Sequence, residues 1–219
     1  MVDLIHGLRS EVVQRNLERA RARIADAGRG PDEVEILAAV KYLPAAELSA
    51  LADGGVTVVG ENRAQELIAK QDVAGNAFTW DFIGQLQSRK VRDLIGRVRY
   101  IHSVASESAL TQLKRHGTAA TEVLIEVNVA GQAGKSGIAP AELPGFLERC
   151  PVTVVGLMTM PPQAADPELN RPYFAALREL AARHHLRHLS MGTSQDYAVA
   201  AAEGATIVRL GTSLYRATA

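Results

Sequence analysis

The sequence predicts an α/β fold, a (β/α)8 TIM barrel with an extra N-terminal helix, formed as a single domain. Two observations predict it. Short β-type runs recur eight times along the chain, and helix-compatible stretches separate them. The length of 219 residues fits one large domain, because barrels of this kind are known from about 200 residues upward.

The first predicted element is a leading helix over residues 4–27, which Gly28 ends. The apolar residues that recur at helical spacing are Val13, Leu17, Ala20 and Ile24. We expect residues 1–30 to pack as this helix on a barrel, so that residues 1–219 form one domain.

Eight β-type runs follow Pro31, at residues 35–40, 56–59, 79–84, 100–104, 122–129, 152–158, 188–191 and 206–211. Helices are predicted between them at 45–52, 63–71, 106–116, 172–184 and 194–203, with Gly54, Gly117 and Gly204 as C-terminal caps. This alternation implies right-handed crossovers and a parallel sheet. The competing architecture is an open doubly wound sheet, but its glycine-rich G-x-G-x-x-G turn is missing from the sequence.

The composition excludes several classes of protein. The 24 basic and 24 acidic side chains give a formal net charge of zero, which argues against the basic surface that nucleic acids or anionic membranes require. No apolar run approaches the roughly 20 residues that span a bilayer, and the charged N-terminus is unlike a signal peptide, so we expect a cytoplasmic protein. The single cysteine, Cys150, excludes an internal disulfide and a cysteine-rich metal site, and we expect no metal.

Lys41 is the first candidate functional residue, because it follows a run of apolar and small residues at the end of the first predicted strand. Active sites of barrels lie where the strands end, so its amine should reach the mouth of the barrel. A desolvated lysine of this kind can form a Schiff base with an aldehyde or ketone. The alternative is a lysine whose head group simply reaches water.

The last two strand ends predict a phosphate site. Ser194 lies in the polar segment after the seventh strand, and Gly211 and Thr212 follow the eighth, where barrels commonly bind phosphate. Helix capping by Ser194 and Asp196 is the alternative. Arg209 lies between the two segments in an apolar run, either bonded to a ligand or in a buried ion pair with Glu61 or Glu126.

A lysine, a phosphate site and an arginine at one mouth match the groups of pyridoxal 5′-phosphate (PLP): an aldehyde, a phosphate and a pyridine nitrogen. The sequence resembles the pyridoxal phosphate homeostasis proteins, which are single-domain barrels similar to the N-terminal domain of alanine racemase. The resemblance runs from about Leu4 to Arg216. The stretches that carry it are residues 37–44 (LAAVKYLP), 58–66 (VVGENRAQE), 80–90 (WDFIGQLQSRK), 101–106 (IHSVAS), 126–138 (EVNVAGQAGKSGI), 156–160 (GLMTM), 189–197 (LSMGTSQDY) and 208–215 (VRLGTSLY).

The resemblance implies roles for individual residues. Lys41 would form the internal aldimine, and Asn62 would lie beside the cofactor. Ser194, Gly211 and Thr212 would bind the phosphate, and Arg209 would face the pyridine nitrogen. Three further residues would line the same mouth, namely Ser190, Met191 and Gly192, and Asn128 and Lys135 would lie in or near its rim.

The sequence departs from the family pattern beside these positions. Val40, Tyr42 and Leu43 flank the lysine where members often carry Ser and Thr-Lys. Gln85 and Arg89 replace the usual His and Asn, and Thr193 replaces a common Met. The departures leave the cofactor anchor intact but put any inherited substrate contact or lid role in doubt.

The resemblance implies a PLP-binding protein that buffers or delivers the cofactor with little amino-acid turnover. Its implied partners are PLP and the apo-enzymes that accept it, and the sequence leaves open a monomer or a weak dimer. A PLP-dependent amino-acid racemase of low activity remains an alternative, with Tyr42, Tyr197 and Tyr215 near the site. A Schiff-base aldolase without cofactor also fits the lysine, although it leaves Arg209 less well explained.

Overall fold

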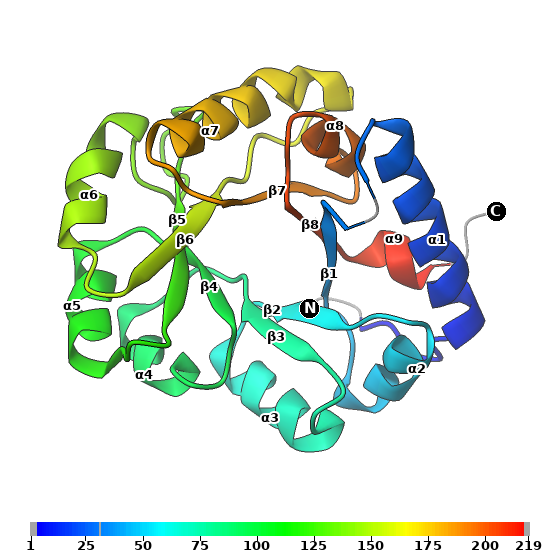
Figure 1. The fold of residues 1–219 in the computed structure, drawn as a ribbon. Coiled ribbons are helices and arrows are strands. Elements are labelled where there is room, and N and C mark those ends of the chain that lie inside the picture. The colour runs from blue at the N-terminus through cyan, green and yellow to red at the C-terminus, as the bar shows by residue number, and fades with distance from the viewer. Residues whose placement is uncertain (1–3, 31, 217–219) are drawn as a thin grey trace.

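Eight parallel strands form a closed barrel in the computed structural model, which describes residues 4–30 and 32–216 (Figure 1). Each strand pairs with the next in the chain, and β1 pairs with β8, so the predicted (β/α)8 barrel is confirmed. The strands are β1 (Glu35–Ala39), β2 (Val58–Glu61), β3 (Thr79–Phe82), β4 (Tyr100–Val104), β5 (Glu122–Glu126), β6 (Thr153–Met158), β7 (His188–Thr193) and β8 (Ile207–Leu210).

Helices surround the barrel on its outside (Figure 1). They are α1 (Ser10–Asp26), α2 (Leu48–Asp53), α3 (Ala64–Ala74), α4 (Val91–Leu94), α5 (Glu107–His116), α6 (Leu143–Arg149), α7 (Arg171–Arg183), α8 (Tyr197–Ala202) and α9 (Thr212–Tyr215). Short 3-10 helices lie at Ala45–Glu47, Ser88–Lys90, Pro140–Glu142 and Pro167–Asn170. The main hydrophobic core lies between the strands and these helices, whereas Leu37, Val58 and Ile207 form a smaller cluster.

Helix α2 begins at Leu48 rather than at residue 45, because Ala45–Glu47 form a 3-10 helix, and α1 and α8 also begin later than the sequence predicts. Helix α1 begins at Ser10 rather than at residue 4, because Glu47 accepts hydrogen bonds from the backbone N–H groups of Gly7 and Leu8 and Gly7 has a φ of 69°. Helix α8 begins at Tyr197 rather than at residue 194. There, the Asp196 carboxylate accepts the backbone N–H of Thr193 and closes a turn before the helix. In both places a side chain competes with the helix for backbone donors.

Several strand boundaries also differ from the prediction. Strand β2 lies two residues further along, at Val58–Glu61, because the Val56 N–H bonds the Leu51 carbonyl and ends α2. Strand β5 ends at Glu126 rather than at residue 129, and Val127 bridges Ile138 across the following loop. Helices α4, α6 and α9 were not predicted, since none has more than two turns to show a helical period.

Helix α1 packs against α2 and α9 and brings the first helix beside the last (Figure 1). The buried Asn16 amide donates hydrogen bonds to the carbonyls of Leu214 and Arg216, at 3.1 and 2.9 Å. Helix α1 is therefore bonded to the segment that follows β8 through the side chain of Asn16.

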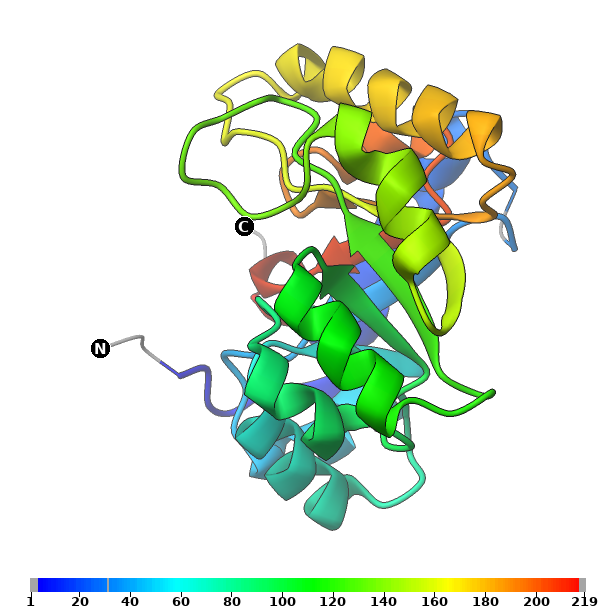
Figure 2. The ribbon, with the colours of Figure 1, turned by 90° about the vertical axis from the view of Figure 1, so that its left-hand side faces the viewer.

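Two long loops, after β5 and after β6, project from the same end of the barrel (Figure 2). This is the end at which the parallel strands finish, where the sequence places the candidate site. Within residues 4–30 and 32–216, no helix combines the length and apolar character needed to cross a membrane.

Candidate functional site

A cavity of about 540 Å³ lies at the carboxyl ends of the strands. The predicted site residues that line it are Lys41, Asn62, Ser194, Arg209, Gly211 and Thr212. The loops after β5 and β6 contribute Lys135 and Met160. Residues at or just beyond the ends of β1, β2, β7 and β8 therefore meet in one space, although they are far apart in the sequence.

Lys41 lies two residues beyond β1, where the Val40 N–H still bonds the Gly60 carbonyl of the neighbouring strand. The side chain is exposed, and its Nζ lies 4.6 Å from the centre of the Tyr42 ring. The amine is thus at the mouth of the barrel, supported by an aromatic face and accessible to a ligand in the cavity.

A buried ion pair fixes the backbone on either side of this position. The ammonium of Lys70, on α3, lies 2.5 Å from Glu61 and 2.7 Å from the carbonyl of Val40. The other carboxylate oxygen of Glu61 accepts the backbone N–H groups of Asn62 and Arg63. The pair therefore joins the ends of β1 and β2 just where Lys41 and Asn62 leave the strands. Sequence reasoning missed it, because a lysine on an amphipathic helix is usually exposed.

Asn62 carries an unsatisfied acceptor. Its Oδ1 is buried and has no hydrogen-bond partner in the described part of the chain. The backbone of Asn62 is held from the far side by Gly84, where a Cβ would lie 2.0 Å from the Asn62 carbonyl oxygen. An unpaired buried oxygen in a cavity wall costs free energy unless a ligand donates to it.

Ser194 connects the two segments predicted to hold phosphate. Its hydroxyl oxygen accepts the backbone N–H of Gly211, at 3.2 Å, and the hydroxyl of Ser213, at 2.8 Å. Asp196 bonds Thr193 and the amide of Asn170, and makes no side-chain cap on α8. The helix-capping alternative is therefore wrong for both Ser194 and Asp196.

Arg209 is buried, and all its hydrogen bonds go to uncharged acceptors. Nη1 donates to the backbone oxygen and the hydroxyl of Ser190, at 2.9 and 2.7 Å. Nη2 donates to the Thr159 carbonyl and to the sulfur of Met160, both at 2.9 Å. Burial lowers the pKa of Arg209 to about 10, against the opposing charges of Glu126 and Asp196, and the side chain remains a cation at neutral pH.

The buried ion pair that the sequence offered as an alternative for Arg209 is wrong. Glu61 pairs with Lys70, and Glu126 accepts a hydrogen bond from Ser136. Within the described residues, Arg209 has no carboxylate among its partners. The charges of Glu126 and Asp196 act on Arg209 only from beyond hydrogen-bond distance.

The three predicted residues of β7 lie behind the cavity rather than in its lining. Ser190 and Met191 are fully buried, and the Ser190 hydroxyl accepts a hydrogen bond from Arg209 on the side away from the cavity. Gly192 has a φ of 91°, and a Cβ there would lie 2.6 Å from the Ala200 side chain, so only glycine fits between the strand and α8.

The remaining candidates divide between the cavity and its surroundings. Tyr42 and Thr193 line it. Asn128 instead bonds Gln132 within its own loop, and Tyr215 donates its hydroxyl to the Ala39 carbonyl behind β1. Gln85 and Arg89 are not part of the lining. No cluster of potential metal ligands occurs among residues 4–30 and 32–216.

Comparison with known proteins identifies the family. The model of the alanine racemase N-terminal domain matches residues 9–219, and the pyridoxal phosphate homeostasis protein of Aquifex aeolicus is 41% identical, with 94% of this chain and 96% of that protein covered. The chain belongs to the pyridoxal phosphate homeostasis protein family.

Solved structures agree with membership in the pyridoxal phosphate homeostasis family. PipY of Synechococcus elongatus, solved with PLP bound and without it, is 32% identical; its PLP-bound structure superposes with a TM-score of 0.79 over 93% of this chain and 100% of that chain. Alanine racemase of Corynebacterium glutamicum is 17% identical, with a TM-score of 0.69 over 95% of this chain and 61% of that one. The second similarity shows a shared fold alone.

Proposed function

We propose that this protein binds pyridoxal 5′-phosphate and serves in its intracellular homeostasis, holding the cofactor reversibly and releasing it to apo-enzymes with little amino-acid turnover. The observation that carries the proposal is the meeting of Lys41, Arg209 and Ser194 in one cavity. Relatives that carry the homeostasis name, and the PLP-bound PipY structure, support it.

The residues present fit the cofactor. A cavity of about 540 Å³ is of the size that holds small ligands. PLP supplies an aldehyde that condenses with an amine, a ring that stabilises negative charge, and a phosphate that accepts hydrogen bonds. The unpaired Oδ1 of Asn62 is suited to accept the ring hydroxyl. The guanidinium of Arg209, whose Nη2 bonds a carbonyl and a thioether, is suited to donate to an electron-rich ring nitrogen.

Each residue then has a distinct task. Lys41 holds the cofactor covalently, and its exposure lets water or an incoming amine reverse the link. Ser194, Gly211 and Thr212 bind the phosphate through hydroxyl and backbone N–H groups. Ser190 supports Arg209, while Met191 and Gly192 shape the wall behind it.

Two features of the chain favour holding the cofactor over turning over amino acids. A permanently charged guanidinium opposite the ring nitrogen disfavours the protonated ring, which makes the ring a weaker electron sink. Racemisation also needs a second base, and Tyr215 is unsuited to that role, because its hydroxyl donates to the Ala39 carbonyl and burial raises its pKa. Tyr42 lines the cavity, but its ring lies against the amine of Lys41.

Covalent trapping tests the proposal. Purified protein is mixed with PLP, reduced with borohydride and analysed by mass spectrometry, in parallel for Lys41→Ala and for Lys135→Ala, which removes another lysine of the same cavity. Before reduction, we expect the visible absorption of a Schiff base between lysine and PLP in the parent and in Lys135→Ala, and after reduction we expect trapped cofactor in the same two proteins. Both signals should be lost in Lys41→Ala. Undiminished trapping in Lys41→Ala would show that another amine holds the cofactor.

Two further measurements separate homeostasis from catalysis. Loaded protein should reactivate an apo-enzyme that requires PLP, and the cofactor content of the donor should fall as activity appears. Loss of α-deuterium from labelled L-alanine should proceed no faster than with free PLP. Exchange well above that rate, and dependent on Lys41, would favour the low-activity racemase instead.

A further inference from the structure

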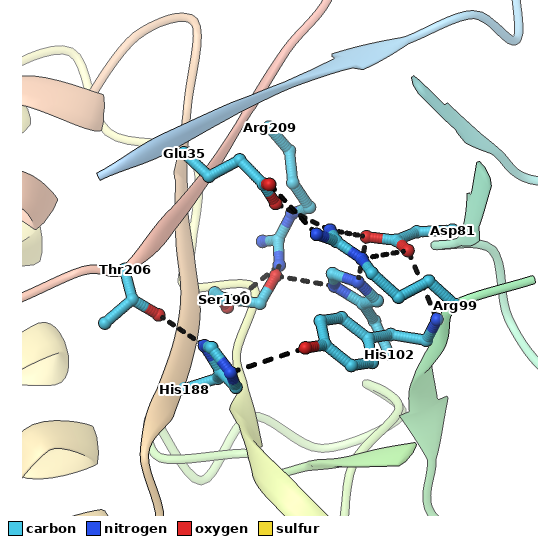
Figure 3. A network of polar contacts seen from close by, with 9 residues as sticks. Glu35, Asp81, Arg99, His102, His188, Ser190, Thr206 and Arg209 are labelled. Atoms are coloured by element: carbon cyan, nitrogen blue, oxygen red, sulfur yellow. Dashed lines mark hydrogen bonds and ion pairs between the residues drawn. The ribbon is translucent and has the colours of Figure 1, made fainter. Parts of the chain in front are cut away.

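A chain of buried polar side chains crosses the inside of the barrel and ends at Arg209 (Figure 3). Asp81 of β3 bonds His102 of β4, with Oδ2 3.1 Å from Nε2. The other ring nitrogen of His102, Nδ1, lies 2.8 Å from the hydroxyl of Ser190 on β7. That hydroxyl accepts from Arg209 on β8, at 2.7 Å. Asp81, His102 and Ser190 are completely buried.

One arrangement of the hydrogen atoms gives every donor in this chain an acceptor. Arg209 can only donate, so the Ser190 oxygen accepts from it. The Ser190 hydroxyl hydrogen can then be donated to Nδ1 of His102, whereas a proton on Nδ1 would use the second lone pair of Ser190 and take that acceptor away. The arrangement that satisfies both groups has a neutral His102 with its proton on Nε2, facing the Asp81 carboxylate.

The surrounding charges favour the same arrangement. Burial lowers the pKa of His102, and the charges of Arg209 and Arg99 add to this effect, whereas Asp81 opposes it. Burial would raise the pKa of Asp81, but His102 and Arg99 outweigh it and lower that pKa. An ionised Asp81 and a neutral His102 therefore coexist at neutral pH.

The far end of the chain is anchored at the base of the barrel. Arg99 donates to both oxygens of Asp81, at 3.0 and 2.6 Å, and also to Glu35 (Figure 3). Glu35 and Arg99 line a separate cavity of about 360 Å³. The chain thus runs from the base of the barrel to its mouth and orients each member in turn.

We propose that His102 is a positioning residue: through Ser190 it fixes Arg209 as an N–H donor aimed at the cavity, so that bound PLP keeps its ring nitrogen unprotonated. The inference rests on the proposed function and names the residues that set the state of the cofactor there. Nη1 of Arg209 is committed to Ser190, and Nη2 to Thr159, which leaves the Met160 thioether as the weak contact that a ring nitrogen can replace. Glu126 and Asp196 are the acidic groups whose charges act on Arg209.

Two substitutions of His102 separate this role from packing. The amide oxygen of His102→Asn lies where Nδ1 is, and can still accept from Ser190. In His102→Gln the amide reaches toward Asp81, so Ser190 loses its acceptor. His188→Gln is a matched control, because His188 bonds Tyr100 and Thr206 at the base and takes no part in the chain to Arg209.

The measurement is the ¹⁵N chemical shift of the ring nitrogen in labelled PLP bound to each variant, followed against pH. We expect an unprotonated nitrogen in the parent protein, in His102→Asn and in His188→Gln. In His102→Gln and in Ser190→Ala, which removes only the hydroxyl, the nitrogen should gain a proton within the neutral pH range. Unchanged titration in both of these variants would overturn the proposal.

A second spectrum does not depend on the cofactor. In ligand-free protein, ¹⁵N shifts of the imidazoles should show His102 neutral with its proton on Nε2. A cationic His102, or a proton on Nδ1, would overturn the arrangement even if PLP binds. Failure of the parent protein to bind PLP would refute the proposed function instead, so the two failures are distinguishable.

Discussion

Lys70 and Arg209 are both buried cations near the carboxyl ends of the strands, but different atoms surround their charges. Lys70 lies 2.5 Å from the Glu61 carboxylate, whereas Arg209 bonds only neutral oxygens and a sulfur. Removing a cation from water has a large free-energy cost, and a carboxylate partner offsets it. The Lys70 charge is therefore paired directly with a carboxylate, whereas Arg209 has no carboxylate among its hydrogen-bond partners in the described residues.

The largest expected effect on stability comes from breaking the ion pair between Glu61 and Lys70. Glu61→Ala leaves the Lys70 ammonium buried without a counter-charge and frees two backbone N–H groups, so the free energy of unfolding should fall by about 3–5 kcal/mol. Urea unfolding followed by circular dichroism measures the loss.

A double variant provides the control for this pair. Glu61→Gln with Lys70→Met keeps an acceptor for the backbone N–H groups and removes both charges, so it should recover most of the lost stability. Equal destabilisation of the single and double variants would mean that packing rather than charge explains the loss.

A smaller effect on stability is expected when Arg209 is replaced. Arg209→Gln removes donors from the carbonyls of Thr159 and Ser190 but also removes a buried charge that no carboxylate bonds directly, so the ligand-free protein should lose about 1–3 kcal/mol. The stabilisation that added PLP gives the parent protein should shrink in this variant, because ligand binding raises stability by mass action.

Urea unfolding with and without PLP measures both quantities. If ligand-free Arg209→Gln lost as much free energy of unfolding as Glu61→Ala does, the proposed difference between the surroundings of Lys70 and Arg209 would be contradicted. An undiminished PLP effect would show that Arg209 does not contribute to holding the cofactor.

The smallest expected effect is a pH dependence of the free energy of unfolding that arises from His102. The pKa of His102 is lowered in the folded protein, so the unfolded chain takes up a proton first as pH falls. The contribution of His102 to the free energy of unfolding is complete above about pH 6.5. Below that pH it is lost by at most about 1.4 kcal/mol per pH unit.

The difference between the parent protein and His102→Asn isolates this contribution, because the other titrating groups are common to both. The stability curves should converge as pH falls below about 6.5. Parallel curves would mean that His102 is protonated alike in the folded and unfolded states.

The fold could be predicted because the eight alternations repeat one pattern that tolerates errors at the ends of elements. The errors arose where side chains compete for backbone donors, as Glu47 does before α1 and Asp196 before α8. The strand ends also located the cavity residues, since parallel strands finish at one edge of the barrel.

The partners of those residues could not be predicted. Glu61 meets a lysine from α3, and His102 of β4 meets Ser190 of β7 across the barrel interior. The first contact was missed because a lysine on an amphipathic helix is usually exposed. The second depends on how the strands are staggered around the closed barrel, which local patterns do not encode. The same applies to Arg209, whose acceptors come from β7 and from the segment after β6.

The pairing of β1 with β8 has a consequence for biosynthesis. Lys41 is synthesised long before Arg209, Gly211 and Thr212, and the barrel closes only when β8 docks between β7 and β1. A nascent chain that still lacks β8 would carry the amine of Lys41 without the proposed phosphate site. Under the proposed function, stable capture of PLP would therefore have to wait until β8 has been made and has docked.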